Sequence, residues 1–175
     1  AGAITDTGSG SISAGGTTTL AAQTGDAITF DATNNEIATL LVTMGGNVFV
    51  DDNSGGIDLG ASTVSGTLDV ITSGAITQSG ALAVTGISTF DAGGTTVTTN
   101  DITLDNAANT FSTGVITQGG NVTIDDADNL ILGEVTAGGT LLVDVNNGAI
   151  TGTQTIAVTG VATFETGGTV TTTND

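Results

Sequence analysis

Seven residue types are missing from this chain of 175 residues: lysine, arginine, histidine, cysteine, proline, tryptophan and tyrosine. Because its 18 carboxylates have no cation to balance them, the formal net charge is −18 at pH 7. A chain without a basic patch cannot neutralise phosphates, which excludes nucleic acid as a partner. Most general bases, nucleophiles and oxyanion clamps are also missing, so we do not expect an enzyme.

Other absences bear on location. Without cysteine the chain has neither a disulfide framework nor a thiolate metal site. Its longest apolar stretch, around residues 37–44, is far shorter than the roughly 20 residues that span a bilayer, so we expect no membrane insertion. The sequence begins with neither an initiator methionine nor a signal-peptide pattern. We interpret it as a mature product or as a segment of a longer chain.

What the sequence does contain is a long internal repeat. The phrase Gly-Ala-Ile-Thr begins at Gly2, Gly74 and Gly148, and the differences in number are 74 − 2 = 72 and 148 − 74 = 74. Residues 74–101 and 148–175 are identical at 17 of 28 positions. We therefore expect a single repetitive domain. It spans residues 1–175 and contains copies 2–73 and 74–147 and a partial copy, 148–175.

Each copy divides again into pieces of the size of one solenoid coil. Start points at Asp101, Asn121, Thr140 and Val161 give lengths of 121 − 101 = 20, 140 − 121 = 19, 161 − 140 = 21 and 175 − 161 = 14. Within the pieces, apolar residues recur at every second position, as in a strand with one buried face, and Gly, Asn and Asp clusters provide the corners. The residues expected to point inward are Leu82, Ile102, Leu104, Phe111, Val122, Ile124, Leu130 and Leu132. The sequence therefore predicts an all-β fold, a parallel β-solenoid (β-helix) of about 18 to 21 residues per coil with a 74-residue higher-order repeat.

The repeat also leads to an expectation about stacking. The Asp51-Asp52 pair recurs as Asp125-Asp126, again with a difference in number of 125 − 51 = 74. If one copy is a whole number of coils, Asp51 lies below Asp125 on the same face of the rod. The three Gly-Ala-Ile-Thr phrases would then occupy equivalent corners.

Three recurring phrases carry a family resemblance: Gly-Ala-Ile-Thr-Gln at residues 74–78, Asp-Ile-Thr-Leu-Asp-Asn-Ala-Ala-Asn-Thr-Phe at 101–111, and Gly-Asn-Val-Thr-Ile-Asp-Asp-Ala-Asp-Asn-Leu at 120–130. In this style of repeat the chain resembles filamentous-haemagglutinin-like bacterial surface proteins and other β-strand-repeat adhesins. The resemblance implies a right-handed β-helix, secretion, and a role at the cell surface or in an extracellular matrix. It identifies no ligand.

The acidic turns are the candidate binding sites. Asp125-Asp126-Ala127-Asp128-Asn129 places three carboxylates and an amide close together in one turn, and hard oxygen ligands of this kind suit Ca²⁺. The candidate metal ligands are Asp51, Asp52, Asp125, Asp126 and Asp128. Solvated turns that bond to nearby backbone are the simpler interpretation. The same aspartate pairs could form a two-carboxylate glycosidase, but their recurrence argues for a structural turn, because an active site is usually built once.

The expected function is that of a structural module outside the cell or on its surface, forming a fibre, stalk or matrix filament by end-to-end stacking. Partners would be further copies of the chain, head to tail and side by side, and no cofactor is required. One alternative is an adhesin surface that binds a cell-surface or matrix ligand. A second is a calcium-dependent assembly protein of a biofilm or surface layer.

Overall fold

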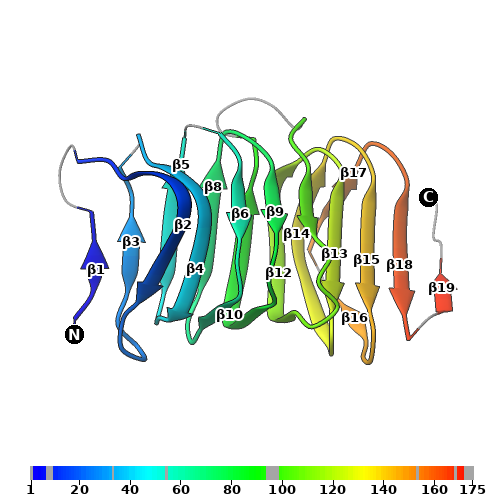
Figure 1. Cartoon of the computed structure of the whole chain (residues 1–175). Coiled ribbons are helices and arrows are strands. Elements are labelled where there is room, and N and C mark those ends of the chain that lie inside the picture. Colours follow the sequence, from blue (N-terminus) through cyan, green and yellow to red (C-terminus); the bar gives the residue numbers. More distant parts are fainter. Residues whose placement is uncertain are drawn as a thin grey trace.

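A computed structural model shows the chain as a rod of stacked coils, with one terminus at each end (Figure 1). The structure describes residues 2–6, 10–32, 34–53, 55–93, 99–152, 154–167 and 169–171. Over these ranges the chain forms strands and turns and no helix. The described residues accordingly include no helix that could cross a membrane. The predicted all-β parallel solenoid is confirmed.

The strands form two hydrogen-bonded sheets, in which every pairing is parallel except that of the last two strands. The ten-stranded sheet contains β1 (Ile4–Thr5), β3 (Ile28–Phe30), β5 (Val48–Asp52), β7 (Ser62–Val64), β8 (Leu68–Thr72), β10 (Leu82–Asp91), β12 (Thr110–Gly119), β14 (Leu130–Ala137), β16 (Ile150–Thr151) and β17 (Ile156–Val158). The nine-stranded sheet contains β2 (Ser13–Ala21), β4 (Glu36–Met44), β6 (Ile57–Leu59), β9 (Ile76–Gln78), β11 (Ile102–Leu104), β13 (Val122–Asp126), β15 (Leu141–Val145), β18 (Ala162–Thr166) and β19 (Thr169–Thr171).

Each coil has three sides, because the long strands β10, β12 and β14 bend at a corner and pair on both sides of it. We call the sides faces 1, 2 and 3 in chain order. Face 1 contains β1, β3, β5, β8, the C-terminal parts of β10, β12 and β14, and β17. Face 2 contains the N-terminal parts of β2 and β4, together with β6, β9, β11, β13, β15 and β18. The C-terminal part of β4 continues onto face 3, where Gly45, directly after β4, bridges Val64 of β7. Face 3 contains β7, the N-terminal parts of β10, β12 and β14, and β16.

The register of face 2 confirms the predicted coil length. Ile102 pairs with Val122, Val122 with Leu141, and Leu141 with Ala162. These differences in number, 20, 19 and 21, are those of the predicted pieces, and each residue directly follows one of the predicted start points. Face 1 has eight rungs, from β1 to β17, and at about 4.8 Å per rung they extend over roughly 34 Å.

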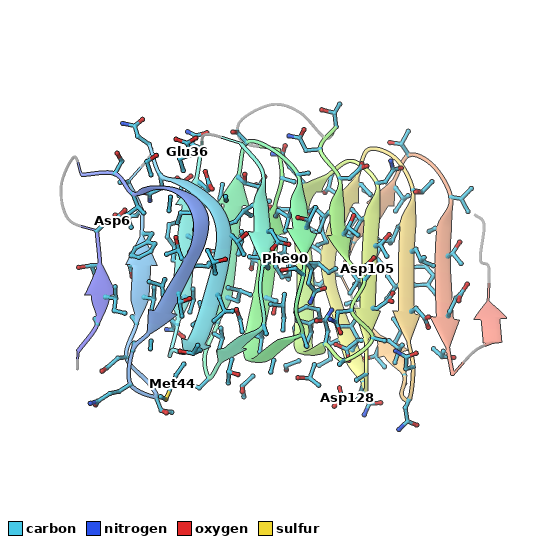
Figure 2. The ribbon with its side chains drawn as sticks, in the orientation of Figure 1. Asp6, Glu36, Met44, Phe90, Asp105 and Asp128 are labelled. Atoms are coloured by element: carbon cyan, nitrogen blue, oxygen red, sulfur yellow. The ribbon has the colours of Figure 1, made fainter. Side chains whose placement is uncertain are left out.

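The core is a narrow column of small apolar side chains. All eight residues predicted to point inward are buried, with at most 2% of their surface exposed. Among its largest members, the rings of Phe90 and Phe111 meet edge to face, with centroids 6.0 Å apart. Figure 2 shows Phe90 within the stack, whereas Glu36 and Asp128 lie at its margins. Several polar side chains are also buried, and one of them is that of Ser88. Among the described residues, its hydroxyl has no hydrogen-bond partner.

The stacking expectation is wrong. Asp51 belongs to β5 on face 1, whereas Asp125 belongs to β13 on face 2. The Gly-Ala-Ile-Thr phrases likewise lead into β1 on face 1, β9 on face 2 and β16 on face 3. Equivalent residues of successive copies therefore lie on successive faces.

The physical reason is the length of the repeat. From Ile28 the face 1 register runs through Val48 and Leu68 to Ser88, which is three coils with a difference in number of 20 each. Ile102 is the equivalent of Ile28 in the next copy, since 102 − 28 = 74, but it follows Ser88 by only 102 − 88 = 14 and lies on face 2. One copy is thus three coils and one further side. It advances about 16 Å along the rod and turns by about a third of a revolution.

The shorter interval between the first two copies has a local origin. Ile4 pairs with Ile28, a difference in number of 28 − 4 = 24, whereas for the equivalent pair, Ile76 and Ile102, it is 102 − 76 = 26. Two additional residues in this single coil account for the difference between the intervals of 72 and 74. The following coil keeps its length, because Ile28 pairs with Val48 and Ile102 with Val122, a difference in number of 20 in both copies.

Candidate functional site

The paired aspartates point in opposite directions because they occupy consecutive positions of a strand. In β13, Val122, Ile124 and Asp126 are buried, while Thr123 and Asp125 are partly exposed. In β5, Asp52 is buried and Asp51 is partly exposed in the same way. Each acidic pair therefore contributes one inward and one outward carboxylate, and the two have different roles.

The inward carboxylate binds the backbone of a neighbouring coil. Asp126 Oδ2 accepts a hydrogen bond of 2.7 Å from the Phe111 amide, and its Oδ1 accepts one of 2.9 Å from the Asp128 amide. Asp52 Oδ2 accepts the equivalent bond from the Ile37 amide, at 2.9 Å. Phe111 and Ile37 are themselves separated by one copy of the repeat, since 111 − 37 = 74. The repeat therefore reproduces the contact as well as the residues.

A buried asparagine completes this corner. Asn109 Oδ1 accepts a hydrogen bond from the Leu82 amide at 2.9 Å, and its Nδ2 donates to the carbonyl oxygens of Asp125 at 3.1 Å and Leu104 at 3.3 Å. Its side chain also bonds that of Gln78. Because these partners belong to three successive coils, one amide group joins all three.

The first copy contains the same asparagine corner. Asn35 Oδ1 accepts from the Ile12 amide at 2.9 Å, and its Nδ2 donates to the Asp51 carbonyl at 3.3 Å. Asp6 takes the place of Gln78, since its Oδ2 accepts from Asn35 Nδ2 at 2.9 Å. Both asparagines are completely buried. We call each Asn–Asp pair, Asn35 with Asp52 and Asn109 with Asp126, a corner staple.

The outward carboxylates form a row on face 2. Asp125 is in register with Asp144, and Asp144 with Glu165, on three successive coils. Asp105 directly follows β11, the strand that precedes β13 in this face. Partial burial raises the pKa of Asp125, and the negative charges of Asp144, Asp105 and Glu165 raise it further. The row therefore concentrates like charges that the chain does not neutralise.

Two further pKa values are raised for similar reasons. Burial raises the pKa of Asp126 to about 6, against hydrogen bonds from the Asp128 and Phe111 amides that lower it. Burial also raises the pKa of Asp51, and the charges of Asp52 and Asp31 add to the effect. Removal of a carboxylate from water disfavours its charged form, and no cation offsets that cost here.

The five candidate calcium ligands are thus distributed over two corners. Asp51 and Asp52 lie on face 1, and Asp125, Asp126 and Asp128 lie on and after face 2. Asp52 and Asp126 face inward and accept backbone hydrogen bonds. Among the described residues, no group of three or more acidic, histidine or cysteine side chains is placed to hold a metal ion. Calcium binding stays a prediction.

Sequence reasoning found the acidic pairs but missed Asn35. The signal was available, because Asn35 and Asn109 are separated by one copy of the repeat, as are Asp52 and Asp126.

The sequence matches the family described as Repeats of unknown function (DUF5649) over residues 1–43, 45–118 and 119–175. These matches cover almost the whole chain, which therefore belongs to this family of β-solenoid repeats. The middle match has a length of 118 − 45 + 1 = 74, which is that of the internal repeat. Searches of curated proteins and of solved structures give no match.

Proposed function

We propose that this chain is a non-enzymatic structural segment of an extracellular or cell-surface fibre, stalk or matrix filament. The observation that carries the proposal is the use of the repeated polar residues. Asn109 and Asp126, like Asn35 and Asp52, direct their polar atoms at the backbone of neighbouring coils. The repeat thus preserves a device that holds coils together, as expected where selection acts on the rod itself.

The ends of the rod support association end to end. Within the described residues, β1 pairs only with β3 and β2 only with β4, so both leave one edge unpaired. At the other end β16 and β17 each pair only with β14, whereas β19 covers the edge of β18 in an antiparallel hairpin. Unpaired edges favour the addition of further strands, from the same chain or from another copy.

A location outside the cell is supported by the resemblance of the repeats to bacterial surface proteins. The high negative charge is consistent with this setting, since it keeps the rod soluble and repels nucleic acid. The proposal requires neither a cofactor nor a catalytic residue.

The test uses an edge position that is free to change. At β1, the amide of Ile4 donates to the carbonyl oxygen of Ala27, and the amide of Asp6 donates to that of Thr29. The intervening amide of Thr5 therefore points to the open side. Thr5→Pro removes that donor and obstructs the edge, while both bonds to β3 stay possible. Thr5→Val, which keeps the amide, is the matched control.

Sedimentation velocity over a range of concentrations distinguishes the outcomes. We expect the parent chain and Thr5→Val to form larger species as concentration rises, and Thr5→Pro to require at least several-fold higher concentration. Circular dichroism verifies that all three chains fold alike. A parent chain that sediments as a monomer at every concentration, or a Thr5→Pro chain that associates as well as Thr5→Val, contradicts end-to-end stacking.

A further inference from the structure

The corner between faces 3 and 1 carries an unusual apolar surface. Ile87 is in register with Thr113, and Thr113 with Ile131, so the two isoleucines are separated by one coil on the outside of the rod. Each exposes 49% of its surface. Isolated exposed apolar residues are common, but two large ones aligned beside a groove are informative.

A groove of about 390 Å³ lies along these isoleucines. Its lining is Ile87, Thr113, Val115, Ile131, Leu132, Gly133, Glu134 and Gln154. We call this surface the isoleucine groove.

Glycine explains why the surface is hollow. Gly114 follows Thr113 at the corner, and Gly133 stands near it one coil further on. A Cβ atom at Gly133 would come within 2.5 Å of Val115 Cγ2, so the valine side chain occupies the space that a side chain at 133 would need. Val115 therefore fills this space and contributes to the lining of the groove together with Ile87 and Ile131.

Charge indicates what can occupy the groove. The chain carries 18 carboxylates and no cation, so two copies repel each other over most of their surface. The lining of the isoleucine groove contains one carboxylate, that of Glu134. An apolar strip with so little charge is a surface at which a second copy can approach with little repulsion, and its contact removes isoleucine from water.

We propose that the isoleucine groove is a side-by-side contact between two copies of this chain, related by a two-fold axis so that the same surface faces itself. A two-fold contact needs only one self-complementary patch on each copy. The proposal rests on the proposed structural function, since it supplies the lateral contact of a filament whose ends stack. It also predicts that salt strengthens pairing, because screening weakens the repulsion of the carboxylates outside the groove.

The experiment separates lateral from end contacts. In the Thr5→Pro background, sedimentation equilibrium compares the parent groove with Ile87→Thr/Ile131→Thr, which keeps β-branched side chains at both positions. The control is Val161→Thr, which also replaces an exposed β-branched apolar side chain by threonine, at a residue that is 53% exposed and lies outside the groove. Glu134→Gln removes the one carboxylate of the lining.

We expect the Thr5→Pro chain to form pairs that tighten with added salt. The double isoleucine variant should raise their dissociation constant at least about tenfold, which is a typical effect of truncating central apolar contacts. Val161→Thr should leave it unchanged and Glu134→Gln should lower it. Pairs that survive the double variant unaltered, or a Thr5→Pro chain that stays monomeric in high salt, overturn the lateral contact. Neither result bears on end-to-end stacking, which depends on the comparison of Thr5→Pro with Thr5→Val.

Discussion

Replacement of Asn109 by alanine should destabilise the rod severely. The side chain is completely buried and bonds the Leu82 amide and the carbonyl oxygens of Asp125 and Leu104. Alanine leaves these backbone groups buried without the partner that the asparagine provided. Each such group costs about 1–3 kcal/mol, and since carbonyls tolerate the loss better than amides, we expect a total of about 3–5 kcal/mol. That is a large part of the roughly 5–15 kcal/mol by which a domain is typically stable.

Equilibrium urea unfolding, followed by far-UV circular dichroism, measures this loss. The matched control is Asn121→Ala, because Asn121 also joins coils through Thr140 and Asp101 but is exposed, so water can replace its bonds. It should cost less than about 1 kcal/mol. If Asn109→Ala lowers the free energy of unfolding no more than Asn121→Ala does, the corner staple does not hold the coils together.

Three further predictions concern charge and burial. The pKa of Asp126 in the folded chain, about 6, lies above its ordinary value of 3.8, so its contribution to stability is present below pH 3.8 and is lost as pH rises through 6. The loss is at most about 3 kcal/mol, and urea unfolding between pH 4 and 8 should show a slope that Asp126→Asn flattens. Ser88→Ala should leave the unfolding free energy unchanged or raise it by about 1 kcal/mol, because it removes a buried hydroxyl that has no partner among the described residues. A loss above about 1 kcal/mol would contradict this reasoning. If divalent ions bridge the carboxylates of face 2, a chelator should weaken assembly as measured by sedimentation. The Asp125→Asn/Asp144→Asn variant should abolish this effect of the chelator. Assembly that is unchanged by the chelator and by the double variant would contradict a role for calcium.

The strands and the core could be predicted because alternation is a local property. Val122 and Ile124 point inward for the same reason that Thr123 points outward. The same alternation, continued to the end of the strand, also places Asp126 inside. In the sequence, however, adjacent aspartates indicate a single solvated acidic turn. A buried aspartate without a cation is unexpected unless its backbone partners are known, and one of them, the Phe111 amide, comes from another coil.

The faces could not be predicted from the repeat length alone. The last and shortest piece of each copy is compatible with two structures. It could form a complete short coil, or it could form only one side of a coil and a wide turn. Only the pairing of Ile102 with Ile76 and Val122 shows that it is one side. The isoleucine groove was also beyond sequence reasoning, because Ile87 and Ile131 are far apart in the sequence and become neighbours through Thr113.

We propose that this chain is a segment of a continuous structural rod. Electron cryo-microscopy of the purified chain at high concentration is the decisive test. We expect filaments in which rungs about 4.8 Å apart run parallel to one another and continue without interruption across the junction between copies. Separate particles about 34 Å long at every concentration, with no rung shared between copies, would contradict it.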